Sequence, residues 1–294
     1  MRILLLCLFS LLAACQSHHA AAPPAPIAPQ GRDHADFGVI RELATGRALT
    51  PQELVEHLAG APRLLVGEQH DNPDHHALQL WLLRELAAQR PQGSLLMEML
   101  NPDQQARVDA AQAASRAGQP PADPYQALAW QANWDWGVYG AVVNYALRQP
   151  YPLLAANLDR SQILQIYQQR PTLSGEASTT PQVQATLLDD IRGSHCGLLP
   201  EALLPAMLAV QQQRDRRMAE RLLTAPTPAL LLAGAFHVRK DLGVPLHLKD
   251  LGAAQGNVVL VLAEAGKTVS AENADYVWYT AAQPEQDHCA QLRQ

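Results

Sequence analysis

RLLVGEQHDNPDHH, residues 63–76, is the stretch that decides the fold. Its first six residues form an apolar run without alternation, which is typical of a strand covered on both faces in a parallel sheet. Asn72 followed by Pro73 predicts a helix start, because Asn caps helix N-termini and Pro suits the first helical position. A buried strand that leads through polar residues into a helix indicates an α/β fold.

Further runs repeat this pattern along the chain. Strands are predicted over 94–99, 151–157, 228–236, 257–265 and 275–280, the last as an edge strand. Helices are predicted to begin at Thr50–Pro51 (with Glu53 completing a capping box), Asn72–Pro73, Asn101–Pro102 and Thr180–Pro181, and a long helix over about 200–223. We therefore predict an α/β fold with a mainly parallel sheet covered by helices and an inserted helical subdomain, with helical excursions at about 101–148 and 158–226.

The first 36 residues differ in character from the rest. Arg2 precedes about 12 mostly apolar residues, too few to span a bilayer but enough for a signal core. The run Leu12–Cys15 reads as a lipobox, which predicts a lipoprotein signal peptide over 1–14 and lipidation (diacylglycerol, palmitate) of Cys15. An ordinary secretory signal with a chance cysteine is the alternative. Residues 15–36, rich in Ala and Pro, are predicted to form a flexible tether.

Composition narrows the function of residues 37–294, which are long enough for one large domain. A net charge of −6 with scattered basic residues gives no nucleic-acid footprint. No second apolar stretch of about 20 residues follows the signal. In an exported protein, the two remaining cysteines, Cys196 and Cys289, are expected to form a disulfide, with a metal site as the alternative.

Polar residues follow the predicted strands at the sheet edge where α/β proteins bind ligands. They include Glu68 and His70, Glu98, and His237. Buried carboxylates and imidazoles need partners, so these four side chains are candidates for a catalytic cluster or for a divalent metal held by Glu68, His70 and His237. A purely structural polar network is the alternative. His75 and His76, in the first turn of the next helix, fit either role.

Six blocks of the sequence resemble the ChaN-like family of haem-binding lipoproteins, in order over about residues 37–290. They are LLVGEQHDNPDHHALQ (64–79), AANLDR (155–160), IRGSHCGLLPE (191–201), RDRRMAERLL (214–223), GAFHVRKDLGVPLHL (234–248) and ADYVWYT (274–280). The two GxxH segments, 67–70 and 234–237, are also similar to a motif of the wider Tiki, TraB and EreA-like group.

The resemblance implies a lipid-anchored protein of the bacterial cell envelope that takes part in haem and iron acquisition. Gln16 after the lipobox cysteine is similar to the signal of lipoproteins sorted to the outer membrane. Haem would be the cofactor, and a homodimer formed on haem binding and a haem receptor would be partners.

The resemblance implies that a Tyr or a His coordinates the haem iron. Our preferred ligand is His195, and Arg192 and Arg214 are candidates to pair with the propionates. Tyr139, Tyr145 and Tyr167 stay open as ligands. The alternative function is a metal-dependent hydrolase or protease of the Tiki-like type that uses the strand-end cluster.

Overall fold

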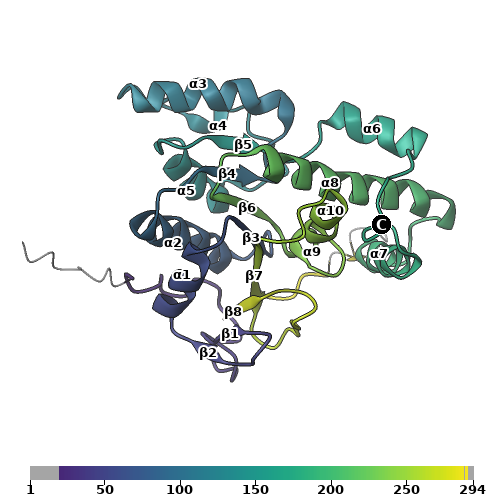
Figure 1. Ribbon diagram of the computed structural model, residues 1–294, viewed down its shortest axis with the longest axis horizontal. Coiled ribbons are helices and arrows are strands. Elements are labelled where there is room, and N and C mark those ends of the chain that lie inside the picture. Colours follow the sequence, from purple (N-terminus) through teal and green to yellow (C-terminus); the bar gives the residue numbers. More distant parts are fainter. Residues whose placement is uncertain (1–19, 288, 291–294) are drawn as a thin grey trace, which may run out of the picture.

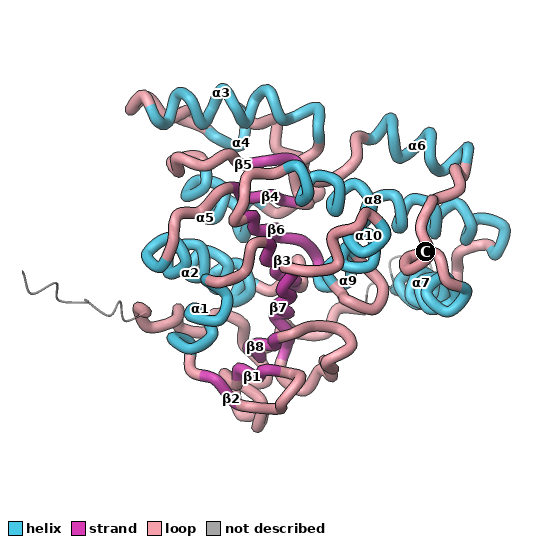
Figure 2. The backbone as a smooth tube through the Cα atoms, viewed as in Figure 1, coloured by secondary structure: helices cyan, strands magenta, loops and turns pink. Residues whose placement is uncertain are grey.

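A computed structural model of the protein describes residues 20–287 and 289–290. One eight-stranded sheet runs through the centre of the molecule, with helices on both sides (Figures 1 and 2). The predicted signal peptide and Cys15 lie outside the described residues.

The sheet is mainly parallel, as predicted. Its order is β2-β1-β8-β7-β3-β6-β4-β5, and the six strands from β8 to β5 all run parallel. The strands are β1 Ile40–Glu42, β2 Ala48–Leu49, β3 Arg63–Glu68, β4 Ser94–Met97, β5 Leu153–Ala155, β6 Ala229–Gly234, β7 Asn257–Glu264 and β8 Tyr276–Thr280. The prediction that the last run forms an edge strand was wrong, because β1 pairs antiparallel with the outer side of β8.

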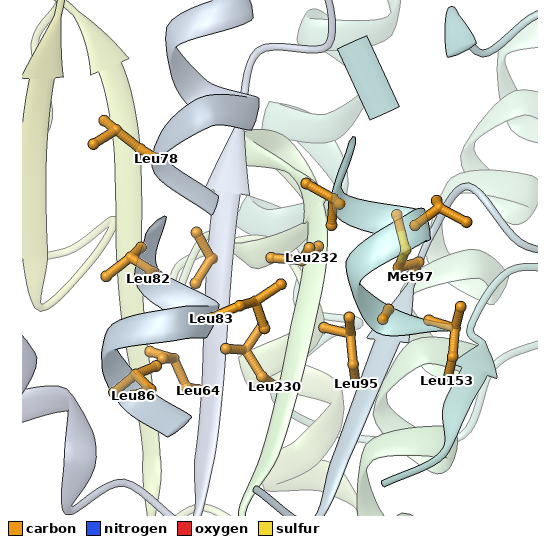
Figure 3. Packing of buried hydrophobic residues seen from close by; sticks show 14 of the residues in the cluster. Leu64, Leu78, Leu82, Leu83, Leu86, Leu95, Met97, Leu153, Leu230 and Leu232 are labelled. Atoms are coloured by element: carbon orange, nitrogen blue, oxygen red, sulfur yellow. The ribbon is translucent and has the colours of Figure 1, made fainter. Parts of the chain in front are cut away.

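Alternate residues of each central strand serve two separate hydrophobic cores. In β3, Leu64 and Val66 belong to one core and Leu65 to the other. Figure 3 shows Leu64, Leu95, Leu153 and Leu230 in the first core, beside Leu82, Leu83 and Leu86 of the adjacent helix. Both faces of the sheet are therefore apolar, which explains why these runs show no alternation.

Most helices begin at the predicted capping residues. Thr50 and Glu53 form a capping box at the first helix, and Asn72 and Thr180 cap two others. After Asn101, a 3-10 turn over Pro102–Gln104 precedes the α-helix that begins at Gln105. The helices are α1 Pro51–Ala59, α2 Pro73–Gln89, α3 Gln105–Arg116, α4 Pro124–Ala127, α5 Trp136–Ala146, α6 Arg160–Gln169, α7 Pro181–Ser194, α8 Leu204–Thr224, α9 Ala235–Val238 and α10 Val244–Asp250, with a 3-10 turn at Glu201–Leu203.

The helices form layers. Helices α1, α2 and α5 cover one face of the sheet, and α8, α9 and α10 cover the other (Figure 1). Helices α6 and α7 pack on α8, outside the layer that touches the sheet. The region 158–226 is therefore a helical layer on one side. The region 101–148 instead contributes α5 to the opposite core and α3 to the side of β5.

Residues 20–36 differ from the expected flexible tether, because they lie against the domain. Asp74 Oδ1 accepts hydrogen bonds from the backbone N–H groups of Ile27 and Ala28, at 2.5 and 3.1 Å. Gln30 pairs with Ala282 as a β-bridge beyond β8. The sequence could not indicate this docking, since Ala and Pro here contribute mainly backbone groups. Within residues 20–287 and 289–290, no helix combines the length and apolar character needed to cross a membrane.

Candidate functional site

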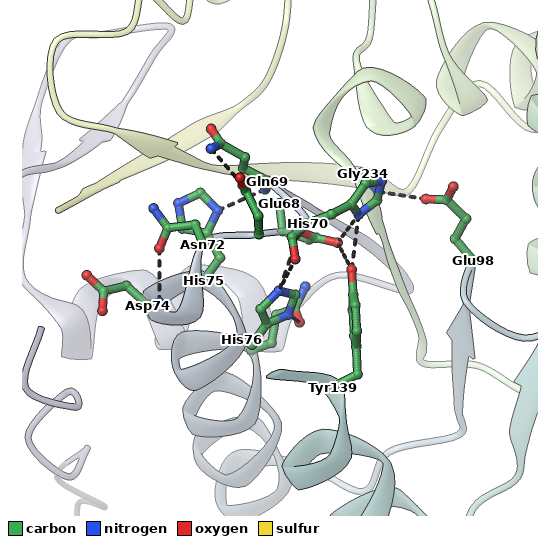
Figure 4. Close-up of polar contacts among 12 residues, drawn as sticks. Glu68, Gln69, His70, Asn72, Asp74, His75, His76, Glu98, Tyr139 and Gly234 are labelled. Carbon is green, nitrogen blue, oxygen red and sulfur yellow. Dashed lines mark hydrogen bonds and ion pairs between the residues drawn. The ribbon is translucent and has the colours of Figure 1, made fainter. Parts of the chain in front are cut away.

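The carboxyl end of β3 carries the first half of the candidate site. Glu68 is buried, and its Oε1 accepts a hydrogen bond from the Tyr139 hydroxyl at 2.8 Å and lies 2.7 Å from His70 Nδ1. Figure 4 shows these three side chains converging from β3 and α5. The His70 side chain is 44% exposed, so it is the part of this trio that solvent reaches.

The buried Glu68 carboxylate helps to shift the pKa values of both His70 and Tyr139. Burial lowers the pKa of His70, but the hydrogen bond and charge of Glu68 outweigh it, and the net pKa is raised. Burial and the Glu68 charge both raise the pKa of Tyr139 well above its usual value, so its phenol stays protonated. Tyr139 therefore acts as a hydrogen-bond donor that fixes Glu68.

A second carboxylate–imidazole pair lies where β4 and β6 end. Glu98 Oε2 accepts from Gly234 N–H at 2.8 Å, and its Oε1 lies 3.2 Å from His237 Nε2. The other His237 nitrogen, Nδ1, lies 2.5 Å from Asp215 Oδ1 of α8. Burial lowers the pKa of His237, but the charges of Glu98 and Asp215 outweigh it and raise this pKa to about 10. The imidazole is therefore a cation between two carboxylates.

Gly234 explains how closely the two pairs approach. A Cβ added to Gly234 would lie 2.9 Å from His70 Cε1, so a larger residue would displace the imidazole. A Cβ at Gly67 would overlap Val238 in the same way. The glycines of both GxxH segments are thus required by packing between β3, β6 and α9.

The structure therefore brings together Glu68, His70, Glu98 and His237, the four residues predicted to form the strand-end cluster. It does not support a divalent metal there. Among the described residues, no group of three or more His, Cys, Asp or Glu side chains is arranged to hold a metal ion. Both nitrogens of His237 already face carboxylates.

His195 lies apart from this cluster, at the C-terminal end of α7. Its Nδ1 donates to the Ile191 carbonyl at 2.8 Å, and its Nε2 has no partner among the described contacts. The predicted disulfide between Cys196 and Cys289 is present and ties the residue after His195 to the C-terminal segment. An imidazole whose Nδ1–H is donated to a carbonyl and whose Nε2 makes no described contact is oriented as in metal-bound histidines.

The two candidate arginines differ in what they already contact. Arg192 is partly exposed and pairs with Glu201 through two hydrogen bonds of 3.0 Å and with Asp189 at 2.8 Å. The positive charge of Arg192 is thus already paired with two carboxylates. Arg214 makes no hydrogen bond or ion pair among the described residues, but its Nε is buried, so only its terminal guanidinium nitrogens could meet an anion.

The three open tyrosines are also distinguished by their surroundings. Tyr139 is 1% exposed and bonded to Glu68, which removes it as a direct haem ligand. The Tyr145 ring lies 5.7 Å from the Arg84 guanidinium carbon. Tyr167 is partly exposed on α6.

His75 and His76 are buried structural residues. His75 bonds Gln69 N–H and the Thr280 hydroxyl, and His76 Nε2 lies 2.9 Å from the His70 carbonyl. The rings of His76 and Tyr139 also contact edge to face, with centroids 4.3 Å apart. Both histidines therefore stabilise the chain around the cluster: His75 bonds to Gln69, and His76 contacts His70 and Tyr139.

Two residues that contact the site could not be found from the sequence. Asp215 lies in the charged run RDRR, which reads as a solvated helix face. Trp134 contacts the His70 ring edge to face, with centroids 4.9 Å apart. The strand-end pattern gave no signal for a partner on α8 or for an aromatic side chain from the loop before α5.

The sequence and the fold were compared with known proteins. The family model "Haem-binding uptake, Tiki superfamily, ChaN" matches residues 54–248, more than half of the chain. ChaN of Campylobacter jejuni, solved with cofacial haem binding, is 31% identical, with a TM-score of 0.75 over 83% of this chain and 97% of that one.

A mutant of the erythromycin esterase EreC is more distant, at 13% identity and a TM-score of 0.45 over 82% of this chain and 83% of that one, and carries no functional conclusion. A comparison of the sequence with curated proteins found no match. The family match and the Campylobacter relative show that the chain belongs to the ChaN family of haem-binding uptake proteins in the Tiki superfamily.

Proposed function

We propose that this chain is a haem-binding lipoprotein that takes part in haem and iron acquisition. His195 Nε2 would coordinate the haem iron, and the observation that carries this assignment is the bond from Nδ1–H to the Ile191 carbonyl. That bond selects the tautomer whose Nε2 lone pair is free, and it fixes the direction of the ring.

The surroundings of His195 support haem over a hydrated ion. Leu198, three residues on, is 51% exposed and offers an apolar surface to a porphyrin. The disulfide at Cys196 restrains the loop, so less conformational entropy is lost when the ligand binds. Arg214, which forms no ion pair among the described residues, is the better of the two arginines to pair with a propionate, through its terminal guanidinium nitrogens.

We further propose that the chain is anchored by a lipid and forms a homodimer. Lipidation at Cys15 would hold the protein at the outer membrane, where haem first enters the envelope. The relative from Campylobacter is described with cofacial haems. We extend this arrangement to the present chain as a homodimer in which two haems face each other, with a haem receptor as the further partner.

Haem titration tests the proposed function. Adding haemin to the purified mature protein is expected to produce a Soret band, and His195→Ala is expected to weaken binding about tenfold or more, since one coordinate bond is lost. His34→Ala, at an exposed histidine, is the matched control and should leave binding unchanged. No spectral change with the wild-type protein would refute haem binding; unchanged binding by His195→Ala would refute the ligand.

The lipid anchor is tested separately. Wild-type protein should incorporate labelled palmitate and sediment with outer membranes, whereas Cys15→Ser should do neither. Light scattering during the haem titration measures dimerisation, and a constant mass would contradict the cofacial dimer.

A further inference from the structure

The docked N-terminal segment is held by specific side chains of α2. Ala21 is bound through both of its backbone groups, because Glu85 Oε2 accepts from its N–H at 3.1 Å and the Trp81 indole N–H donates to its carbonyl at 3.0 Å. At the other end, Asp74 Oδ1 accepts from the N–H groups of residues 27 and 28, at 2.5 and 3.1 Å. A simple tether needs no such contacts, so this surface of α2 requires an explanation.

The side chains that hold the segment belong to one face of α2. Four buried residues, spaced by four, three and four positions, share this face and are called the α2 stripe: Asp74, Leu78, Trp81 and Glu85. Asp74 and Glu85 are 6% and 7% exposed, and burying a carboxylate is costly unless hydrogen-bond donors replace the lost water. The stripe therefore suits an extended chain that brings N–H groups to its two ends and apolar groups to its middle.

The chain's own segment has this pattern. The three prolines of residues 23–26 lack an N–H group, so the middle of the segment has little need of acceptors. The six residues from Ala21 to Ile27 rise about 19 Å in a polyproline II chain, and the eleven residues of α2 between the two carboxylates rise about 16 Å. The similar lengths indicate that the segment lies extended along the stripe.

The segment leaves part of the space beneath it empty. A cavity of about 190 Å³ lies between residues 23–26 and a wall that includes Phe37 and Trp278. The rings of Trp278 and Trp81 meet edge to face, with centroids 5.4 Å apart, so this wall is aromatic. Ile27 does not line the cavity, and its side chain is 58% exposed. A segment with a larger apolar side chain over the cavity would bury more apolar surface.

We propose that the groove formed by the α2 stripe, Phe37 and Trp278 binds an extended proline-rich segment of another protein, which replaces residues 21–28 of this chain. Aromatic grooves recognise proline-rich chains because a preformed polyproline II helix loses little entropy on binding. Residues 24–27 are exposed, and the contacts that hold the chain's own segment are made to its backbone, so a related sequence can take its place.

The empty cavity distinguishes between two sources of such a segment. Residues 23–26 of a second copy of this chain would leave the same space unfilled, whereas a partner with a bulkier side chain would fill it. The observations therefore favour a partner of different sequence. This inference requires neither haem nor a lipid anchor, so it is independent of the proposed function.

Peptide binding to the purified mature protein tests the inference. The probes are a labelled peptide of residues 20–30 and the same peptide carrying Ala25→Leu. The chain's own segment competes at an effective concentration of about 1 mM. A chain with Pro23→Gly, Pro24→Gly and Pro26→Gly, whose segment is less preorganised, should therefore bind both peptides about tenfold tighter than wild type. The Ala25→Leu peptide should bind about tenfold tighter than the unchanged one, because it fills the cavity.

Two further measurements locate the bound peptide. Peptide at saturation should accelerate hydrogen exchange over residues 21–28 of the wild-type chain, because it takes over their partners. In the glycine-substituted chain, Trp81→Phe keeps an aromatic ring but removes the N–H donor, and should weaken peptide binding about three- to tenfold. Trp136→Phe, on α5, is the matched control and should leave binding unchanged. Thermal unfolding checks that each variant is folded.

Three outcomes would overturn the inference. The groove would serve only the chain's own segment if the wild-type protein bound neither peptide at millimolar concentration. Binding that Trp81→Phe leaves unchanged would lie outside the groove. A doubled mass in light scattering without haem, lost in the glycine-substituted chain, would show that a second copy occupies the groove instead of a different protein.

Discussion

The charge of His237 depends strongly on the fold. Glu98 and Asp215 raise its pKa to about 10 from 6.5, so the folded chain keeps a proton that the unfolded chain loses. The stability from this pair is complete below pH 6.5 and disappears as pH rises toward 10. We predict that this group lowers the free energy of unfolding by up to about 1.4 kcal/mol per pH unit in that interval. Urea denaturation at several pH values measures it.

The control for this prediction is His237→Gln, which keeps the size of the side chain and removes the titration. Its free energy of unfolding should fall less steeply with pH than that of the wild-type protein. The variant should also be less stable at neutral pH, by about 3–5 kcal/mol, because two buried carboxylates lose their cation. An exposed change, His34→Gln, should alter neither quantity. Equal slopes in wild type and His237→Gln would contradict the assigned charge.

At the scale of elements, the parallel strands could be predicted from the sequence, whereas the two short strands at the sheet edge, β1 and β2, could not. Strands such as β3 and β7 are long apolar runs because each serves two cores, and that property is visible in the sequence. β1 and β2 span three and two residues, and they exist because β8 offers an unpaired side. Likewise, Asp215 of α8 meets His237 because β6 and the short helix α9 bring that imidazole against α8. Such pairings depend on tertiary structure.

The end of α7 gives a prediction at this scale. The disulfide joins Cys196 to Cys289 across a separation of 93 residues, and closing so long a loop limits the unfolded chain. Cys196→Ser with Cys289→Ser should lower the free energy of unfolding by about 2–5 kcal/mol. Residues 195–198 should also exchange their amide hydrogens faster, since their turn is then tied only by local hydrogen bonds.

Reductant on the wild-type protein is the matched comparison for that variant. Dithiothreitol should reproduce both effects, and it should change nothing further in the double serine variant, because no other cysteine lies among the described residues. Protection of 195–198 that stays the same without the disulfide would show that α7 and the turn hold His195 unaided.

For the whole molecule, the docked N-terminal segment determines which side of the domain the proposed lipid anchor would hold near a membrane. Residues 21–28 run antiparallel to α2, from Trp81, which donates to the Ala21 carbonyl at 3.0 Å, to Asp74. If Cys15 carries the lipid, only about 17 Å of extended chain separates it from Ala20. We therefore expect the α1–α2 side of the domain to lie near the bilayer and the α6–α8 side to face away from it (Figure 1).

Asp74 is the residue that tests this docking. Its carboxylate accepts from two backbone N–H groups, and it is 6% exposed, so Asp74→Ala leaves both donors without a partner. We predict a loss of about 1–3 kcal/mol in the free energy of unfolding and faster hydrogen exchange over 20–30. Asp74→Asn, which keeps the acceptor oxygen, should lose less, and Asp71→Ala, at an exposed carboxylate in the preceding turn, should leave exchange over 20–30 unchanged. If Asp74→Ala left that exchange at the wild-type rate, the segment would be held by other contacts, and the expected orientation would lose its support.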